Sequence, residues 1–321
     1  MADAERGTAA MIIPVICGPT ASGKSSLAMW LSLRREITVI SADSRQIYRR
    51  FDIGTAKPTT DEQRRVPHRG IDLVEPTARY SAADWSAMAT AAIDEALAKG
   101  RIPVIVGGTG FYIASLVKPL FMEPEINRDH RDGLQGALAG ADTETLRRWC
   151  TLLDPPRAHL GRVQLLRALE VVMLTGQRLS DLHIERARQG SIEPCYLLVD
   201  PGVELAGRIA RRVQEMLDAG WMDEVRALID TVPPDAPAWK ATGYDVLRQV
   251  VLGEMEPATA RERVVIDTRQ YAKRQRTWFR HQLDEGAVTR VSPTASGWQE
   301  VVDRWITGVE DRMRGSRAGA R

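Results

Sequence analysis

Short runs of apolar residues recur along the chain, and each is bounded by turn residues. They cover residues 11–17, 37–41, 70–74, 102–106 and 195–199. Several are apolar throughout and do not alternate with polar residues, which is typical of strands buried on both faces of a parallel sheet. Stretches with helical periodicity separate them, for example residues 82–99, which Gly100 is expected to cap. The pattern predicts an α/β fold with a doubly wound parallel sheet.

One long segment interrupts this alternation. Residues 123–193 have helical periodicity and no convincing strand, and the chain then returns to an apolar run and finishes with helices. We therefore expect an α/β core made of residues 11–122 and 194–311 and a helical insertion domain over 123–193. The polar, arginine-rich residues 312–321 are expected to be disordered.

The first apolar run leads into a phosphate-binding motif. Its residues are Gly18-Pro19-Thr20-Ala21-Ser22-Gly23-Lys24-Ser25, and a helix-like stretch follows. The alternative is a chance glycine-rich turn, but the full pattern lies between a strand and a helix, the context in which it binds phosphate. Backbone N–H groups and the helix N-terminus would hold the anion, and Lys24 would reach its terminal oxygens. Ser25 would bind Mg²⁺.

Composition is that of an ordinary globular enzyme. The 321 residues are 44% hydrophobic and 27% charged, with a formal net charge of +2, so nucleic-acid binding would require local clusters of basic residues. The three cysteines lack zinc-site spacing, which indicates reduced thiols. No signal sequence or apolar run of about 18 residues is present. We expect a cytoplasmic protein that does not enter the membrane. Its phosphate loop is of the P-loop type found in proteins that bind nucleotides such as ATP.

Polar loops follow the predicted strands, and in an open parallel sheet ligands bind outside the carboxyl ends of the strands. Asp43 follows the second run, where its carboxylate could hold Mg²⁺ through water, take a proton from a nucleophile, or simply form a turn. Residues 107–110, Gly-Gly-Thr-Gly, form a weak motif, although their position favours close approach of the backbone to a ligand. Asp200 follows the fifth run.

A basic stripe lies near the C-terminus. Four residues spaced four, three and four apart share one helix face: Arg269, Lys273, Arg276 and Arg280. Such a stripe is either a footprint for a phosphate backbone or a solvated charged face. A second stripe is expected to pack on the core, and it consists of Val265, Thr268, Ala272, Gln275 and Phe279.

Two further groups remain open from the residues alone. Arg208 and Arg212 lie one helical turn apart, so they could clamp a pyrophosphate or pair with Glu204 and Glu215 at the surface. Thr55 and Lys57 lie in the polar loop 52–58, where they could touch phosphate or shape the turn.

Six blocks, taken in order, resemble the tRNA dimethylallyltransferase family. They are residues 18–25, 41–48, 52–58, 106–112, 167–171 and 268–280. The resemblance implies transfer of a five-carbon prenyl group from dimethylallyl diphosphate to the exocyclic amine of the adenosine 3′ to the anticodon, with Mg²⁺. No Cys-His zinc module follows the last block, so the chain is similar to bacterial members.

The resemblance also implies catalytic roles. Asp43 would accept the proton of the attacking amine, while Lys24, Mg²⁺ held by Ser25 and the N–H groups of residues 18–25 would stabilise the departing diphosphate. Thr20 and Arg212 would also contact the diphosphate.

Recognition of tRNA follows from the same resemblance. The implied partner is the anticodon stem-loop, with the target base flipped outward and Thr109 near the adenosine. The matching positions are Asp43, Ser44, Arg45, Gln46, Arg131, Gln164, Leu165, Leu166, Arg167 and Ala168, to which the basic stripe adds Lys273 and Arg276. No obligate protein partner is expected, and a monomer would suffice.

Three other functions compete with this one. An adenylate isopentenyltransferase would need neither the insertion nor the basic stripe. A P-loop small-molecule kinase would hold ATP in the phosphate loop and use Asp43 toward a hydroxyl substrate. A non-catalytic RNA-binding protein would not depend on Asp43 for any turnover.

Overall fold

The computed structural model describes residues 10–117, 126–185, 192–283 and 285–319. The chain divides into two compact units, Met1–Val117 with Gly190–Arg321, and Lys118–Gln189. The predicted boundary at residue 122 lies outside the described residues. The boundary at 193 was placed too late, because Ile192 and Glu193 already belong to a strand of the sheet. In the described parts of the chain, no helix is long and apolar enough to cross a membrane.

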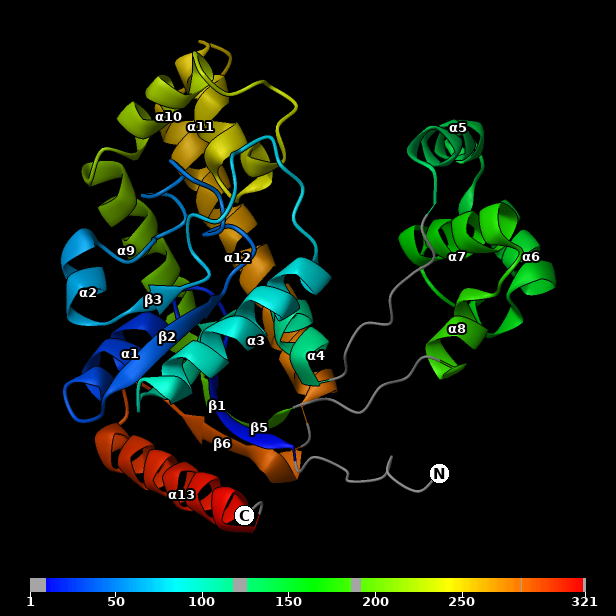
Figure 1. Ribbon diagram of the computed structural model, residues 1–321. Coiled ribbons are helices and arrows are strands. Elements are labelled where there is room, and N and C mark those ends of the chain that lie inside the picture. Colours follow the sequence, from blue (N-terminus) through cyan, green and yellow to red (C-terminus); the bar gives the residue numbers. More distant parts are fainter. Residues whose placement is uncertain (1–9, 118–125, 186–191, 284, 320–321) are drawn as a thin grey trace, which may run out of the picture. The chain divides into compact units, whose positions relative to one another are not determined.

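The larger unit is built on a parallel sheet of six strands, in the order β3-β2-β4-β1-β5-β6 (Figure 1). The strands are β1 Met11–Cys17, β2 Ile37–Ala42, β3 His68–Arg69, β4 Ile102–Gly107, β5 Ile192–Val199 and β6 Val288–Val291. Every neighbouring pair is parallel. The predicted α/β fold with a parallel sheet is confirmed, and β2, β4, β1 and β5 lie next to one another, so the loops that follow them share one edge.

Two strands differ from the prediction. The run at residues 70–74 is not a strand, because Gly70 and Asp72 have φ values of 84° and 52°, and only Val74 forms a bridge, to Tyr48. The short strand β3 precedes it. The sixth strand, β6, was not predicted, because its sequence Val-Thr-Arg-Val holds only two apolar residues.

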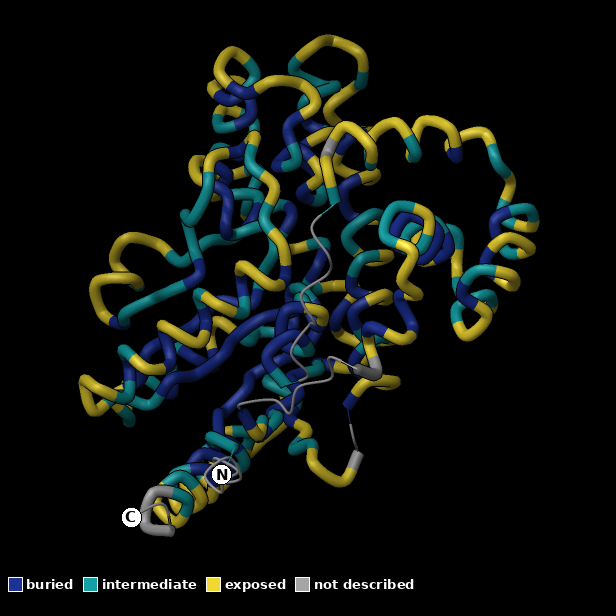
Figure 2. The backbone as a smooth tube through the Cα atoms, turned by 45° about the vertical axis from the view of Figure 1, so that its right-hand side comes forward, coloured by how far each residue is buried: buried dark blue, intermediate teal, exposed yellow. Residues whose placement is uncertain are grey.

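Helices cover both faces of the sheet. The helices of the larger unit are α1 Lys24–Ser32, α2 Thr60–Arg65, α3 Ala82–Ala98, α4 Gly110–Val117, α9 Leu205–Asp218, α10 Trp221–Ile229, α11 Tyr244–Val251, α12 Pro257–Gln282 and α13 Trp298–Gly319, with short 3₁₀ turns at Gly202–Glu204, Pro237–Lys240 and Glu285–Ala287. One face packs on α1 and α13, and the other on α3, α4 and the end of α12. A further core lies among α9, α10, α11 and α12. Figure 2 shows the buried strands inside these exposed layers.

Helix ends follow the local sequence. Ser81 accepts a hydrogen bond from the N–H of Asp84, whose side chain in turn accepts from Ser81, which is a capping box at the start of α3. Gly100, with φ of 70°, ends the same helix as predicted. The prediction of a disordered tail is wrong through residue 319, because α13 continues there and Arg312 pairs with Glu193 on β5.

The smaller unit is helical in its described part, as predicted. It contains α5 Arg128–Leu138, α6 Thr143–Leu153, a 3₁₀ turn at Pro155–Arg157, α7 Arg162–Thr175 and α8 Leu179–Glu185. Its apolar core is its own and includes Leu146, Cys150, Leu165 and Leu169.

Candidate active site

The phosphate loop between β1 and α1 is tightly folded. Gly18, Ala21 and Gly23 have φ values of 148°, 60° and 100°. A Cβ on Gly18 would lie 2.2 Å from the carbonyl oxygen of Val199, so only glycine fits between the loop and β5. The Ser22 hydroxyl is buried and has no hydrogen-bond partner among the described residues. The loop therefore holds polar groups ready for an anion.

Positive side chains converge on this loop. Lys24 donates to the carbonyl oxygen of Pro19 at 2.6 Å, and Arg208 donates to that of Ala21 at 2.9 Å. Desolvation and the charge of Arg212 lower the pKa of Lys24 to about 8, while Asp43 acts in the opposite direction. Burial likewise lowers the pKa of Arg212, against the attraction of Asp43 and Glu215. Arg208 thus supports the loop, while Arg212 lies close enough to Lys24 and Asp43 for its charge to act on theirs.

Several predicted catalytic residues line one cavity. Its polar wall contains Thr20, Asp43, Arg45 and Arg212. Its apolar wall comes largely from α9 and the start of α10, with Ile209, Val213, Met216 and Trp221. Thr268 and Tyr271 of α12 also line it, and burial together with the Asp43 charge raises the pKa of Tyr271 to about 12. A carboxylate, a guanidinium and an apolar surface therefore meet in one enclosed space.

A second and larger cavity, of about 810 Å³, also borders the phosphate loop. Lys24, Ser25, Arg208 and Arg211 line it, while Ala21, Arg212 and Met216 line both cavities. The two cavities are therefore neighbours, and Arg212 borders both.

Mg²⁺ needs few protein ligands, because it keeps waters and binds the phosphates of its substrate. The described residues contain no group of three acidic, histidine or cysteine side chains that would hold a metal on their own. The hydroxyl of Ser25 is exposed at the start of α1 and lines the larger cavity, which suits a hydroxyl ligand of Mg²⁺. The residues present fit a metal that arrives with a diphosphate.

The loops after β2 and β4 are tied together. The N–H of Ser44 donates to the Thr109 hydroxyl at 3.0 Å, and the N–H of Thr109 donates to the carbonyl oxygen of Ala42 at 3.0 Å. Asp43 accepts from the N–H of Arg45 at 2.8 Å, which fixes one carboxylate oxygen. Thr109 is therefore tied to the residues on either side of Asp43, and its place near the adenosine stays a prediction.

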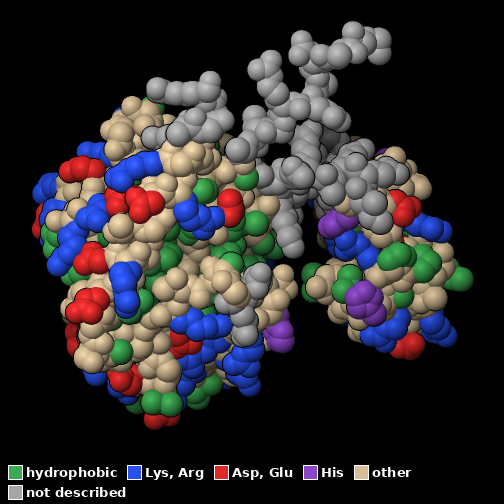
Figure 3. Space-filling model, turned by 90° about the horizontal axis from the view of Figure 1, so that it is seen from below, with side chains coloured by type: hydrophobic (Ala, Val, Ile, Leu, Met, Phe, Trp, Pro, Cys, Tyr) green, Lys and Arg blue, Asp and Glu red, His purple; other side chains and the backbone are tan. Residues whose placement is uncertain are grey.

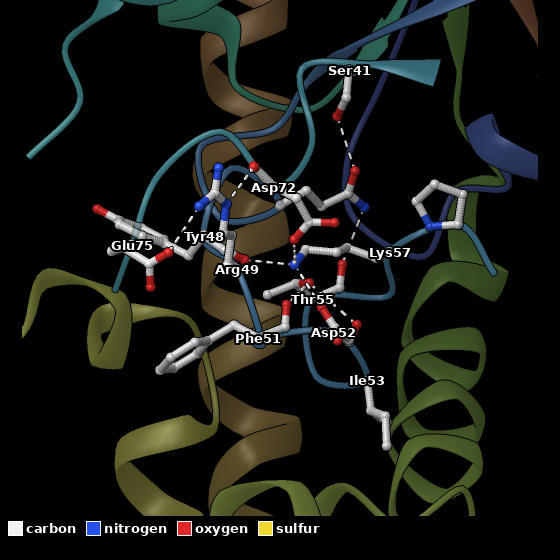
Figure 4. A network of polar contacts seen from close by, with 12 residues as sticks. Ser41, Tyr48, Arg49, Phe51, Asp52, Ile53, Thr55, Lys57, Asp72 and Glu75 are labelled. Atoms are coloured by element: carbon white, nitrogen blue, oxygen red, sulfur yellow. Dashed lines mark hydrogen bonds and ion pairs between the residues drawn. The ribbon is translucent and has the colours of Figure 1, made fainter. Parts of the chain in front are cut away.

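Gln46 and Lys57 are occupied inside the protein. Gln46 accepts from the Ser41 hydroxyl and donates to the carbonyl oxygens of Thr55 and Ala56 (Figure 4). The Lys57 ammonium is 4% exposed and binds the Tyr48 carbonyl, Asp52 and Asp72. Of the two open interpretations of Lys57, the structure supports the shaping of the turn, and Gln46 holds the same loop. The contact of Gln46 with RNA stays a prediction.

The side of α12 that faces the core carries Gln275, a residue whose role the sequence did not indicate. Gln275 was expected only to pack in the core, and its side chain is 6% exposed. Its amide oxygen accepts from the N–H of Thr20 at 2.8 Å, and its amide nitrogen donates to the carbonyl oxygen of Gly108 at 2.9 Å. A glutamine in an otherwise apolar stripe was the signal that this position makes hydrogen bonds.

The basic stripe on α12 divides into two kinds of residue. Arg269, Lys273 and Arg280 are exposed. Arg276 is instead paired with Asp200 and donates to the carbonyl oxygen of Gly202, after β5. Arg276 therefore has partners within the protein, and its contact with an RNA phosphate stays a prediction.

Within the smaller unit, the predicted RNA-contacting residues are also of two kinds. Leu165 and Ala168 are fully buried in its core, so their side chains offer no surface to RNA. Arg131 and Arg167 both pair with the buried Glu170, and Gln164 caps the start of α7 by accepting from the N–H of Gly161. Leu166 is partly buried against that core.

Exposed apolar side chains accompany these residues. Trp149, Leu152, Val163 and Met173 are large and exposed. On the face seen in Figure 3, the smaller unit presents hydrophobic, basic and histidine side chains next to one another.

Comparison with known proteins shows which family the chain resembles. Residues 46–282 match the protein family described as IPP transferase, and residues 11–69 match that described as isopentenyl transferase. The tRNA dimethylallyltransferase of Gloeobacter violaceus is 40% identical over 309 residues, spanning 92% of this chain and 99% of the relative. That of Nitrobacter hamburgensis is 41% identical over 296 residues, spanning 88% and 91%.

Solved structures are similar over the whole chain. The tRNA isopentenylpyrophosphate transferase of Bacillus halodurans is 30% identical with a TM-score of 0.69, covering 96% of this chain and 99% of that one. The corresponding enzyme of Staphylococcus epidermidis is 31% identical with a TM-score of 0.67, covering 94% and 99%. With the family match over residues 46–282 and these relatives spanning nearly the full length, the chain belongs to the tRNA dimethylallyltransferase (IPP transferase) family of prenyltransferases.

Proposed function

We propose that the protein transfers the dimethylallyl group of dimethylallyl diphosphate to the exocyclic amine of the adenosine 3′ to the anticodon in tRNA. The observation that carries this proposal is the single cavity lined by Thr20, Asp43 and Arg212 beside an apolar wall. A prenyl diphosphate has the same two parts, an anionic head and an apolar tail. The family relationship supplies the reaction class.

The reaction forms one carbon–nitrogen bond and breaks one carbon–oxygen bond. The amine attacks the allylic carbon, the diphosphate leaves with the electrons of the carbon–oxygen bond, and the proton of the amine passes to Asp43. The hydrogen bond from Arg45 holds one oxygen of that carboxylate, so the other faces the proton it accepts.

Charge on the departing diphosphate is met by the phosphate loop. Lys24, Arg212 and the Thr20 hydroxyl stabilise its oxygens, and Ser22 offers its unpartnered hydroxyl. Ser25 would hold Mg²⁺, which supplies further positive charge to the diphosphate when bound. In the absence of donor, Lys24 satisfies its ammonium with the Pro19 carbonyl.

The acceptor would approach the Asp43 cavity from the tied loops after β2 and β4. Ser44, Arg45 and Thr109 border that side, and the exposed Lys273 with its basic neighbours on α12 would meet the RNA backbone. Arg131, Arg167 and the exposed apolar side chains of the insertion would contact the anticodon stem-loop, which needs no second protein.

The test is transfer of radiolabelled dimethylallyl from its diphosphate to unmodified tRNA, with Mg²⁺ and without ATP. Adenosine monophosphate is offered beside tRNA as a competing acceptor. Label should enter tRNA, and Asp43→Asn should lower the rate by about 100-fold or more, as for loss of a general base.

Other outcomes select the alternatives. Label in the mononucleotide alone would indicate an adenylate isopentenyltransferase. A strict requirement for ATP would indicate a kinase. Asp43→Asn with a rate within a few-fold of the wild type would remove Asp43 from the role of base.

A further inference from the structure

Helix α12 ties together the loops at the carboxyl edge of the sheet. Gln275 binds the loops after β1 and β4, and Arg276 binds the loop after β5. Trp278 lies against the loop after β4, because a Cβ on Gly110 would approach its ring to 2.1 Å. Thr109 then extends the connection to the loop after β2. The loops of four adjacent strands are thus joined through one helix.

Gln275 makes the central connection. Both polar atoms of its amide are used, one as acceptor from Thr20 and one as donor to Gly108. Glycine at position 108 leaves room for this contact, because a Cβ there would lie 2.2 Å from the amide nitrogen of Gln275 and push it away. The contact with Gly108 is buried and the contact with Thr20 is partly buried. A hydrogen bond left unmade in a buried place costs the desolvation of the orphaned group.

Gln275 joins a loop on the donor side of the proposed site to a loop on the acceptor side. Thr20 belongs to the loop that would hold the diphosphate, and Gly108 precedes Thr109, which borders Asp43 and the acceptor side. Since the N–H of Thr20 is spent on Gln275, its hydroxyl is the group left for the donor. Gln275 therefore fixes the separation of donor loop and acceptor loop without touching either substrate.

We propose that Gln275 is a positioning residue for prenyl transfer, and this inference rests on the proposed function. Reacting atoms must stay in a near-attack geometry, and a displacement of about 1 Å can cost about 100-fold in rate. Loss of the bridge should therefore lower the turnover number more than it lowers affinity for tRNA.

The experiment uses two variants of the full chain, Gln275→Glu and Gln275→Met. A protonated glutamic acid can accept from Thr20 and donate to Gly108, whereas its carboxylate cannot donate. The turnover number of Gln275→Glu, divided by that of the wild type, should rise by about 10-fold or more from alkaline to acidic pH. The turnover number of Gln275→Met should be about 10- to 100-fold below that of the wild type at every pH. Its KM for tRNA should stay within about twofold of the wild-type value.

The control is Gln270→Glu, an exposed residue of the same helix, for which the ratio should be flat with pH. All rates are measured well below the melting temperature of each variant, so that loss of fold does not enter. A flat ratio for Gln275→Glu, or Gln275→Met with wild-type turnover, would overturn the inference.

A binding measurement separates this inference from the proposed function. Inorganic pyrophosphate, followed by calorimetry, should bind Gln275→Met about fivefold or more weakly than the wild type, because the Thr20 loop loses its anchor. If wild-type protein transfers no label to tRNA, the proposed function fails and the inference with it. If the wild type is active and both variants match it in turnover and pyrophosphate affinity, only the role of Gln275 fails.

Discussion

The charge of Lys24 depends on its surroundings more than that of any exposed lysine. Partial burial and the nearby charge of Arg212 lower its pKa to about 8, so the free protein holds it only partly protonated in mildly alkaline solution. A bound diphosphate would favour the ammonium form. The phosphate loop therefore gains charge when it gains its ligand.

This leads to a prediction for pyrophosphate binding. Because the ligand raises the pKa of Lys24, binding at about pH 8 to 9 should take up a proton, and affinity should fall as pH rises above about 8. Calorimetry in buffers of different ionisation enthalpy measures the uptake. Lys24→Met should bind weakly and lose the proton uptake, while uptake that persists in Lys24→Met would assign it to another group.

Arg212 gives a second prediction at this scale. Arg212→Ala should lower turnover by about 10-fold or more, since one charge that meets the departing diphosphate is lost, and should change tRNA affinity little. Steady-state rates with gel-shift measurement of tRNA binding separate the two effects. The reverse pattern would place Arg212 at the RNA interface. Arg304 on α13 is exposed and lines neither cavity, so Arg304→Ala is the matched control.

The roles of some residues could be predicted from the sequence, and those of others could not. The phosphate loop and Asp43 could be predicted because each motif acts within its own few residues. Lys57 and Gln46 could not be assigned, because their partners lie 15 residues away at Asp72 and 9 to 10 away at Thr55 and Ala56, across turns of positive φ. The role of Gln275 depended on Thr20, which is 255 residues distant.

Helix α12 shows the same limit at the scale of an element. Its periodicity correctly separated a buried stripe from a basic one, because 3.6 residues per turn is local information. Periodicity could not indicate that Arg276 turns to Asp200, since that depends on where β5 ends. The helix therefore has three sides: one in the core, one tied to the loops, and one exposed.

The exposed side carries its own prediction. Lys273→Ala should weaken tRNA binding and reduce the slope of log affinity against log salt by about one unit, as expected for one lost phosphate contact. Arg276→Ala should leave that slope nearly unchanged and lower turnover, because it frees the loop after β5. Filter binding across salt concentrations distinguishes them. An unchanged slope for Lys273→Ala would make the stripe a solvated face.

At the scale of the molecule, the two units have separate cores. The buried residues of the smaller unit all lie between Leu138 and Leu182, and no core residue of the larger unit belongs to it. If the donor and the RNA bind as proposed, a change in the core of the smaller unit should weaken RNA binding and leave donor binding unchanged.

Leu169→Ala tests this separation. Leu169 is fully buried in the smaller unit, and its truncation should destabilise that unit by about 2 to 5 kcal/mol. tRNA affinity should fall while pyrophosphate affinity stays at the wild-type value, measured by gel shift and calorimetry. Leu152→Ala, at a position 75% exposed, is the matched control for stability. Loss of pyrophosphate affinity in Leu169→Ala would mean that the units fold as one.

The tie between α12 and the loops also orders events during synthesis of the chain. A nascent polypeptide that has reached Gly202 already contains the phosphate loop, Asp43, Thr109 and Asp200, and domains fold from the N-terminus as they emerge from the ribosome. Gln275 and Arg276 are added only later. A chain that stops before α12 would thus carry the phosphate loop and Asp43 but lack the helix that joins their loops, so we expect its turnover to be far below that of the full chain.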